Sequence, residues 1–182
     1  LLRRALAITE DAFGPDHPST ATTLNNFGNV LQEQGRYDEA EPFYRRALAI
    51  TEDAFGPDHP STATSLNNLG NLLQEQGRYD EAEPLLRRAL AITEDAFGPD
   101  HPSTATTLNN FGNVLQEQGR YDEAEPFYRR ALAITEDAFG PDHPSTATSL
   151  NNLGNLLQEQ GRYDEAEPLL RRALAITEDA FG

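Results

Sequence analysis

Four histidines are the residues whose type most readily suggests metal binding or acid–base catalysis, and each lies in an Asp-His-Pro tripeptide. His17 follows Asp16, and Glu10 and Asp11 lie shortly before it, so weak cation binding at each loop is one hypothesis. We favour the alternative, a helix-capping loop with a solvated histidine. Catalysis needs a nucleophile, its base and an orienting group in a water-excluding pocket, which repeated open loops do not provide. We therefore expect no enzyme, no metal site and no cofactor.

Asn and Gln side chains form a second group with chemical potential, because they recur at fixed spacing along the chain. An amide offers both donors and an acceptor, so it can bind the backbone N–H and C=O groups of an extended peptide whatever the peptide's side chains are. This predicts peptide recognition if the amides share one exposed face. The elements that carry them decide whether they do.

The composition argues against several partners. Acidic residues outnumber basic ones 30 to 14, all basic residues are Arg, and the net charge is −16. Such a charge repels phosphate backbones and anionic membranes, so we expect neither nucleic acid nor membrane and favour neutral or basic proteins as partners. Cysteine is absent, no apolar stretch approaches the ~20 residues of a membrane span, and residues 1–10 do not resemble a signal peptide. The sequence thus predicts a cytoplasmic protein. Residue 1 is not Met, so we expect the chain to be part of a longer one.

The chain is built from a 42-residue repeat. Two forms alternate in an 84-residue doublet and differ at five positions, which in the first doublet are Thr23 against Ser65, Phe27 against Leu69, Val30 against Leu72, Phe43 against Leu85 and Tyr44 against Leu86. Complementary packing between neighbours and drift before a recent doubling both explain these differences. We expect one array, residues 1–182: a helix fragment at 1–14, then repeats at 15–56, 57–98, 99–140 and 141–182.

Each repeat predicts two helices, A and B. Apolar or small residues spaced by three and four, from Leu24 through Gly28 to Leu31, indicate helix A, which ends at Gly35. Helix B opens with Asp38 as its expected cap and ends at Gly-Pro. Helix A follows a Gly-Pro-Asp-His-Pro loop, and in the first repeat we expect Asp16 to be its cap and Pro18 to lie in its first turn.

Small residues should let the two helices approach. Gly28 and Ala40 leave the room, and a larger side chain at either position would push the helices apart. One hairpin buries too little apolar surface to be stable alone, so stability should depend on stacking.

The segment LNNFGNVLQEQGRYDEAEPFYRRAL resembles the tetratricopeptide motif. The spacing of Leu24, Phe27, Gly28, Leu31, Gly35, Tyr37, Ala40, Tyr44 and Ala47 carries the resemblance, and the longer repeat is similar to that of kinesin light chains and related bacterial and fungal proteins. The resemblance implies an all-α, right-handed superhelical solenoid of antiparallel helix hairpins. It also implies that a concave groove lined by helix A binds a peptide or protein.

We expect the polar face of helix A to line that groove. The candidate peptide-binding residues are Thr22, Asn25, Asn29, Gln32, Thr64, Asn67, Asn71, Gln74, Thr106, Asn109, Asn113, Gln116, Thr148, Asn151, Asn155 and Gln158. The alternative is that these side chains only keep the wall soluble or bond to one another. The resemblance also argues against two ligands. Family members that grip carboxylate termini do so with lysines, which this chain lacks, and the preference of kinesin light chains for acidic cargo should not be carried over.

Two other functions stay open. Residues 1–14 and 169–182 are identical, and no polar capping helix covers the last hairpin, which predicts weak head-to-tail self-association. Repeats this uniform also fit an idealised or recently duplicated array without a dedicated ligand. The pair Arg45 and Arg46 is interpreted as a solvated helix face that serves solubility.

Overall fold

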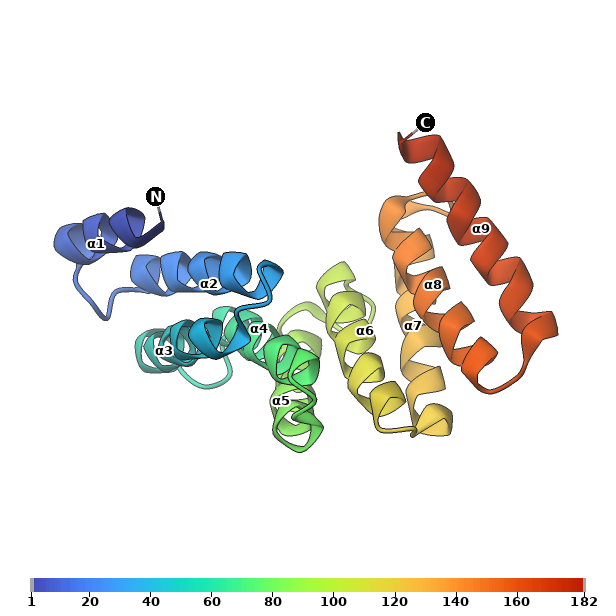
Figure 1. Ribbon diagram of the computed structural model, residues 1–182, viewed down its shortest axis with the longest axis horizontal. Coiled ribbons are helices and arrows are strands. Elements are labelled where there is room, and N and C mark those ends of the chain that lie inside the picture. Colours follow the sequence, from blue (N-terminus) through green and yellow to red (C-terminus); the bar gives the residue numbers. More distant parts are fainter. Residues whose placement is uncertain (1, 182) are drawn as a thin grey trace. The chain divides into compact units, whose positions relative to one another are not determined.

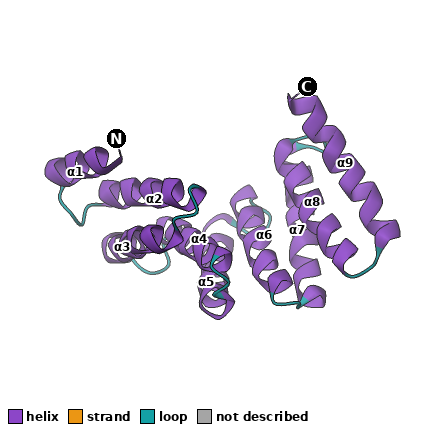
Figure 2. Ribbon diagram, viewed as in Figure 1, coloured by secondary structure: helices purple, strands orange, loops and turns teal. Residues whose placement is uncertain are grey.

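The computed structural model describes residues 2–181, with side chains from 4 to 179, and this part of the chain is all-α (Figure 1; Figure 2). Its nine helices are α1 (Leu2–Phe13), α2 (Pro18–Glu33), α3 (Tyr37–Phe55), α4 (Pro60–Glu75), α5 (Tyr79–Phe97), α6 (Pro102–Glu117), α7 (Tyr121–Phe139), α8 (Pro144–Glu159) and α9 (Tyr163–Phe181). Residues 1 and 182 of the predicted array lie outside the described residues. The chain divides into two compact units, Leu1–Ile92 and Thr93–Gly182, and each is described by itself.

A glycine reverses the chain after each of the shorter helices, which are α2, α4, α6 and α8. Gly35 has a φ of 70°, in the left-handed region that favours glycine, and the Arg36 N–H donates to the Leu31 carbonyl oxygen at 2.9 Å. The turn lays α2 against α3, and the same turn lays α6 against α7. The predicted antiparallel helix hairpins are confirmed.

A histidine caps the N-terminus of each shorter helix. The Nδ1 atom of His59 accepts a hydrogen bond from the Ser61 N–H at 3.1 Å, and Pro60 occupies the first turn of α4. The Thr62 hydroxyl closes the loop by donating to the Gly56 carbonyl oxygen at 2.9 Å. The histidine is therefore a structural residue whose Nδ1 is engaged in the loop.

In α2 the histidine takes the capping position that we expected for an aspartate. His17 is the N-cap of α2, and its Nδ1 accepts from the Ser19 N–H at 3.1 Å. The prediction that Asp16 caps this helix was wrong, because Asp16 lies one residue before the N-cap position. The Pro18 prediction was correct, since Pro18 begins α2.

The expected cap of helix B was also wrong. Helix α3 begins at Tyr37, with Arg36 at the N-cap and no side-chain cap bond, so Asp38 lies inside the first turn. There its Oδ1 accepts from Nε2 of Gln76 at 3.2 Å, in the next hairpin. A carboxylate in this turn still favours the helix through the helix dipole.

The core of each hairpin forms where a glycine meets a large buried side chain. A Cβ atom at Gly28 would lie 2.6 Å from Cε1 of Tyr44, and one at Gly70 would lie 2.7 Å from Cγ of Leu86. No real Cβ contact is that short, so only glycine permits the helices to pack at this distance. The predicted role of Gly28 is confirmed.

Neighbouring hairpins share their apolar side chains. Leu48 of α3 packs against the buried cluster of the next hairpin, and Leu132 of α7 does the same in the second unit. The first cluster consists of Ala63, Leu66, Ala89 and Ile92. Each hairpin thus completes the apolar surface of its neighbour, as expected for a solenoid.

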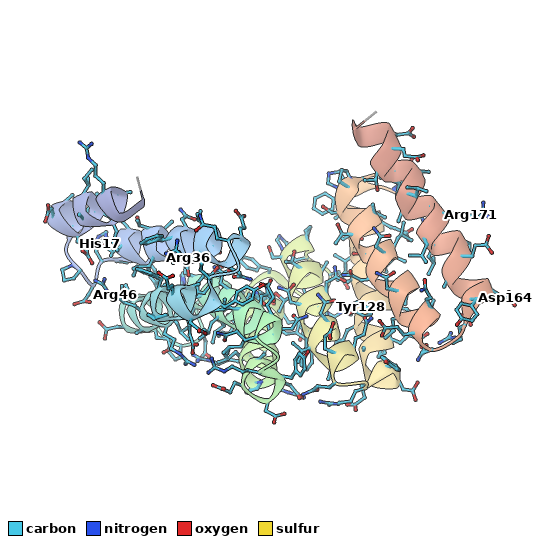
Figure 3. The ribbon with its side chains drawn as sticks, in the orientation of Figure 1. His17, Arg36, Arg46, Tyr128, Asp164 and Arg171 are labelled. Atoms are coloured by element: carbon cyan, nitrogen blue, oxygen red, sulfur yellow. The ribbon has the colours of Figure 1, made fainter. Side chains whose placement is uncertain are left out.

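Arginines join the same neighbours. Arg88 pairs with Glu52 of the preceding helix B at 2.6 Å and donates to the Pro57 carbonyl oxygen at 2.7 Å. Arg46 pairs with Glu10 at 2.6 Å in the same way (Figure 3). The interpretation of Arg46 as a purely solvated residue was therefore wrong. Arg45 lies on the exposed face, where it pairs with Glu41.

Candidate functional site

A polar groove lies between adjacent shorter helices in the first unit. It encloses about 510 Å³, and its walls come from α2 and α4, with the end of α3 completing it. The lining residues are Pro18, Ser19, Ala21, Thr22, Asn25, Asn26, Asn29, Thr51, Phe55, Ser61, Thr64 and Asn68. None of them is charged, so the groove offers hydrogen bonds and apolar contact without an ion-pair partner.

The second unit repeats this groove between α6 and α8. It encloses about 520 Å³. Its lining residues are Pro102, Ser103, Thr106, Asn109, Asn110, Asn113, Thr135, Phe139, Ser145, Thr148 and Asn152. The groove is therefore a recurring product of the repeat.

Asn25 uses its amide to join neighbouring shorter helices. Its Nδ2 donates to the Ser65 hydroxyl of the next shorter helix at 3.3 Å, and Asn109 donates to Ser149 in the second unit at 3.2 Å. The Oδ1 atoms of Asn25 and Asn109 are buried without a hydrogen-bond partner. These side chains hold neighbouring helices together through nitrogen, while their buried oxygens are not offered to the groove.

Tyr44 fixes two further predicted groove residues. Its hydroxyl donates to Oδ1 of Asn29 at 2.6 Å and to Oε1 of Gln32 at 2.8 Å. Burial raises the pKa of Tyr44, and the nearby Glu75 and Glu33 carboxylates raise it further, so the hydroxyl keeps its proton at neutral pH.

These contacts decide how the two amides are oriented. Nε2 of Gln32 donates to Glu75 at 2.8 Å, so Oε1 of Gln32 is turned toward the tyrosine hydroxyl. Oδ1 of Asn29 accepts from the same hydroxyl at the shorter distance. Asn29 lines the groove with its amide held in this orientation, and its Nδ2 is the group that remains to donate to a peptide carbonyl oxygen.

The alternate repeat form lacks this restraint. Leu86 stands where Tyr44 stands in the first repeat, and a leucine offers no hydroxyl to Asn71 or Gln74. The doublet therefore alternates between amides oriented by tyrosine and amides without that partner.

A phenylalanine gives the groove an apolar end. Phe55 lines it with 44% of its surface exposed, and its ring stacks on His59 with the centroids 4.6 Å apart. In the second unit Phe139 lines the groove and stacks on His143. These rings were not among the predicted groove residues. A large apolar residue directly before the Gly-Pro that ends the helix could have indicated them.

The structure brings together some predicted residues and leaves others outside. Those that line the two grooves are Thr22, Asn25, Asn29, Thr64, Thr106, Asn109, Asn113 and Thr148. Those that do not are Gln32, Asn67, Asn71, Gln74, Gln116, Asn151, Asn155 and Gln158. Asn26 and Asn68 line the first groove but were not predicted. Asn26 lies four residues after Thr22 and three before Asn29, so helical spacing could have found it.

Ion pairs lie beside the turn that joins the two helices of a hairpin. Burial pushes the pKa of Glu41 upward, but hydrogen bonds from Arg78 and Arg45 outweigh it and lower that pKa below its usual value. Arg78 of the next hairpin pairs with Glu41 at 2.6 Å.

Within the described residues, no group of three or more side chains is placed to hold a metal ion. Of the helices described, none has the length and hydropathy needed to cross a bilayer.

Antiparallel hairpins that pack in chain order, with glycine at the centre of each, define a helical-repeat solenoid. A sequence profile of the tetratricopeptide repeat matches residues 1–53, 23–95, 61–137 and 103–179. The chain belongs to the tetratricopeptide repeat family. Such repeats are typically protein-interaction scaffolds and are generally not catalytic.

Solved structures of kinesin light chain-like proteins are similar to the chain. Nearly identical TPR-like repeats from Podosopora anserina are 26% identical, with a TM-score of 0.75, and the match covers 99% of this chain and 85% of that chain. A variant of those repeats shares the fold at 24% identity, with a TM-score of 0.78 and coverage of 98% and 84%. BtubC (BKLC) from P. vanneervenii is 25% identical, with a TM-score of 0.82 and coverage of 100% and 72%. No curated protein matches the chain.

Proposed function

We propose that the chain is a protein-interaction scaffold that binds an extended peptide segment in the grooves between its shorter helices. The observation that carries this proposal is the oriented Asn29 amide in a groove without charged residues, next to the exposed ring of Phe55. An amide held in place before binding loses little freedom on binding, which favours affinity. A peptide carbonyl oxygen would accept from Nδ2 of Asn29, and an apolar side chain of the peptide would cover Phe55.

The charge of the chain narrows the class of peptide. The groove walls are neutral, while the chain as a whole carries a net charge of −16. Long-range repulsion would slow the approach of acidic peptides, and the grooves offer no cation to retain them. The expected ligands are neutral or basic segments with main-chain groups free to bond. Neither nucleic acids nor membranes are expected partners, and a cytoplasmic location stays a prediction.

A displayed library of random decapeptides tests the proposal directly. Peptides selected on the intact chain should lose at least about tenfold in affinity, or about 1.4 kcal/mol, when Asn29→Ala and Asn113→Ala are combined. The matched control combines Asp53→Ala and Asp137→Ala at exposed positions of α3 and α7 and should leave affinity unchanged. Selection of no peptide, or equal binding by both variants, would refute the groove as the binding site.

A further inference from the structure

The amides that are held in place on the groove wall offer a ligand a donor and no acceptor. In the first groove Oδ1 of Asn29 accepts from the Tyr44 hydroxyl at 2.6 Å, which leaves Nδ2 to donate to a ligand. Nδ2 of Asn25 donates to Ser65, and Oδ1 of Asn25 is buried. A ligand that enters this groove therefore meets a fixed N–H group, while both fixed amide oxygens are either occupied or out of reach.

The second groove repeats this arrangement. The hydroxyl of Tyr128, which Figure 3 labels, donates to Oδ1 of Asn113 at 2.6 Å. Nδ2 of Asn109 donates to Ser149 at 3.2 Å, and Oδ1 of Asn109 is buried. A donor of fixed direction is thus a property of both grooves.

The acceptors that remain on the wall are less well prepared for a ligand. The hydroxyls of Thr22 and Thr64 are turned toward their own helices, where they donate to carbonyl oxygens at 3.4 and 3.3 Å. The amides of Asn26 and Asn68 also line the groove, and within the described residues neither makes a side-chain hydrogen bond. An amide that the ligand must immobilise adds an entropic cost to binding.

Proline is the residue that suits a wall of this kind. An ordinary peptide residue brings an N–H group, which must find an acceptor when the groove removes water from it. Proline brings no N–H, and its carbonyl oxygen stays free to accept from Asn29. The polyproline II conformation uses no carbonyl in an internal hydrogen bond and is formed before binding, so a proline-containing segment loses little freedom when it binds.

A phenylalanine ring of fixed direction supplies the apolar contact. Phe55 is 44% exposed and stacks on His59 with the ring planes 20° apart. His59 is itself held in place, because its Nδ1 accepts from the Ser61 N–H at 3.1 Å. Phe139 has the same exposure and stacks on His143 in the second groove. Grooves lined by aromatic rings are the surfaces on which proline-rich segments commonly dock.

We infer that each groove selects a proline-containing segment in the polyproline II conformation. In the first groove a carbonyl oxygen of the segment accepts from Nδ2 of Asn29, and a proline ring covers Phe55. This inference rests on the proposed function, since it names the class of peptide that the same grooves bind. A segment extended as a β-strand, with an N–H at every residue, is the alternative that the experiment separates.

Three labelled decapeptides of equal charge separate the effect of the missing N–H from that of the ring. The first repeats Ala-Pro-Pro, the second has N-methylglycine in place of each proline, and the third has alanine there. In fluorescence anisotropy the intact chain should bind the proline peptide at least about tenfold more tightly than the alanine peptide. The N-methylglycine peptide lacks both the N–H and the ring, so its affinity should lie between the other two. An alanine peptide that binds as tightly as the proline peptide overturns the inference.

Tyr44→Phe combined with Tyr128→Phe tests the orientation of the donors. Without the hydroxyls, Oδ1 of Asn29 and its counterpart are free to accept a ligand N–H, so the preference for the proline peptide over the alanine peptide should fall several-fold. A variant that was only less stable would lose affinity for both peptides alike. Tyr37→Phe combined with Tyr121→Phe makes the same two changes outside the grooves and should leave the preference unchanged. An unchanged preference in the first pair of substitutions also overturns the inference.

The displayed library of random decapeptides separates this inference from the proposed function. Peptides selected on the intact chain should be enriched in proline. Selected peptides that lack proline and lose affinity in the chain with Asn29→Ala and Asn113→Ala would keep the grooves as the binding site and overturn the preference for proline. Selection of no peptide would overturn both.

Discussion

The phenol ring of Tyr44 lies over Gly28 so closely that a single added methyl group would stand 2.6 Å from Cε1. The contact joins α2 to α3, and Tyr128 repeats it over Gly112 in the second unit. In the same residue the hydroxyl reaches Asn29 and Gln32. Tyr44 thus sets both the distance between the helices and the orientation of the groove amide.

The packing role of Gly28 predicts an unusual response to Gly28→Ala. Within a helix this change ordinarily stabilises by about 1 kcal/mol. Here the methyl group meets a buried ring, and overpacking of this kind costs about 1–3 kcal/mol. We expect a net decrease in the free energy of unfolding, measured by urea denaturation. In a Tyr44→Ala background the clash is absent, so Gly28→Ala should then be neutral or stabilising. A stabilising effect in the wild-type background would show that the helices can separate at low cost.

Tyr44→Phe tests what the Tyr44 hydroxyl contributes to stability and to the order of the Asn29 amide. The variant keeps the ring and loses two hydrogen bonds, so we expect a loss of about 1 kcal/mol in unfolding free energy. The side-chain amide of Asn29 should become mobile, which nuclear magnetic resonance detects as a reduced heteronuclear Overhauser effect. Tyr163→Phe is the control, since Tyr163 is 65% exposed. An Asn29 amide that is equally ordered without the hydroxyl would contradict the proposed orientation.

The helices could be predicted from the sequence because their signals are local. Spacing of three and four places Leu24 and Leu31 on one face, and Gly35 needs its left-handed conformation whatever lies nearby. The caps were harder to predict. Asp16 and His17 are adjacent and both can cap, and the backbone angles of the loop decide between them.

The site was predicted only in part because its bonds connect distant residues. Helical spacing puts Thr22 and Asn29 on one side of α2, and both line the first groove. It cannot show that Ser65, 40 residues away, binds the nitrogen of Asn25, or that Tyr44, 12 residues away, binds Gln32. These partners come from other helices. Their proximity depends on packing, which the repeat period alone does not reveal.

The histidine caps predict a specific pattern of substitutions at His59. His59→Ala removes the acceptor for the Ser61 N–H and should lower stability by about 0.5–2 kcal/mol, the usual value of a helix cap. His59→Asn keeps a side-chain acceptor at that position and should restore most of the loss. Thermal unfolding followed by circular dichroism measures both. Equal stability of the alanine and asparagine variants would mean that stacking on Phe55, and not the cap, is what His59 contributes.

The ion pairs between hairpins predict an acid-sensitive part of the stability, centred on Glu125. A hydrogen bond from Arg162 of the next hairpin lowers the pKa of Glu125 in the folded state, against the opposing effect of burial, and Arg129 lowers it further. A depressed folded pKa stabilises the protein at neutral pH, above the unfolded value of 4.5, and this contribution disappears as the pH falls through the folded pKa. Glu125→Gln should therefore lower the unfolding free energy at pH 7 and have a much smaller effect near pH 3, measured by denaturation across that range. Glu167→Gln is the matched control, because Glu167 holds the same position on α9, is 63% exposed and, among the described side chains, pairs only with Arg171 of its own helix. If both variants show the same pH dependence, Arg162 does not stabilise the Glu125 carboxylate, and the hairpins are held together by their apolar contacts alone.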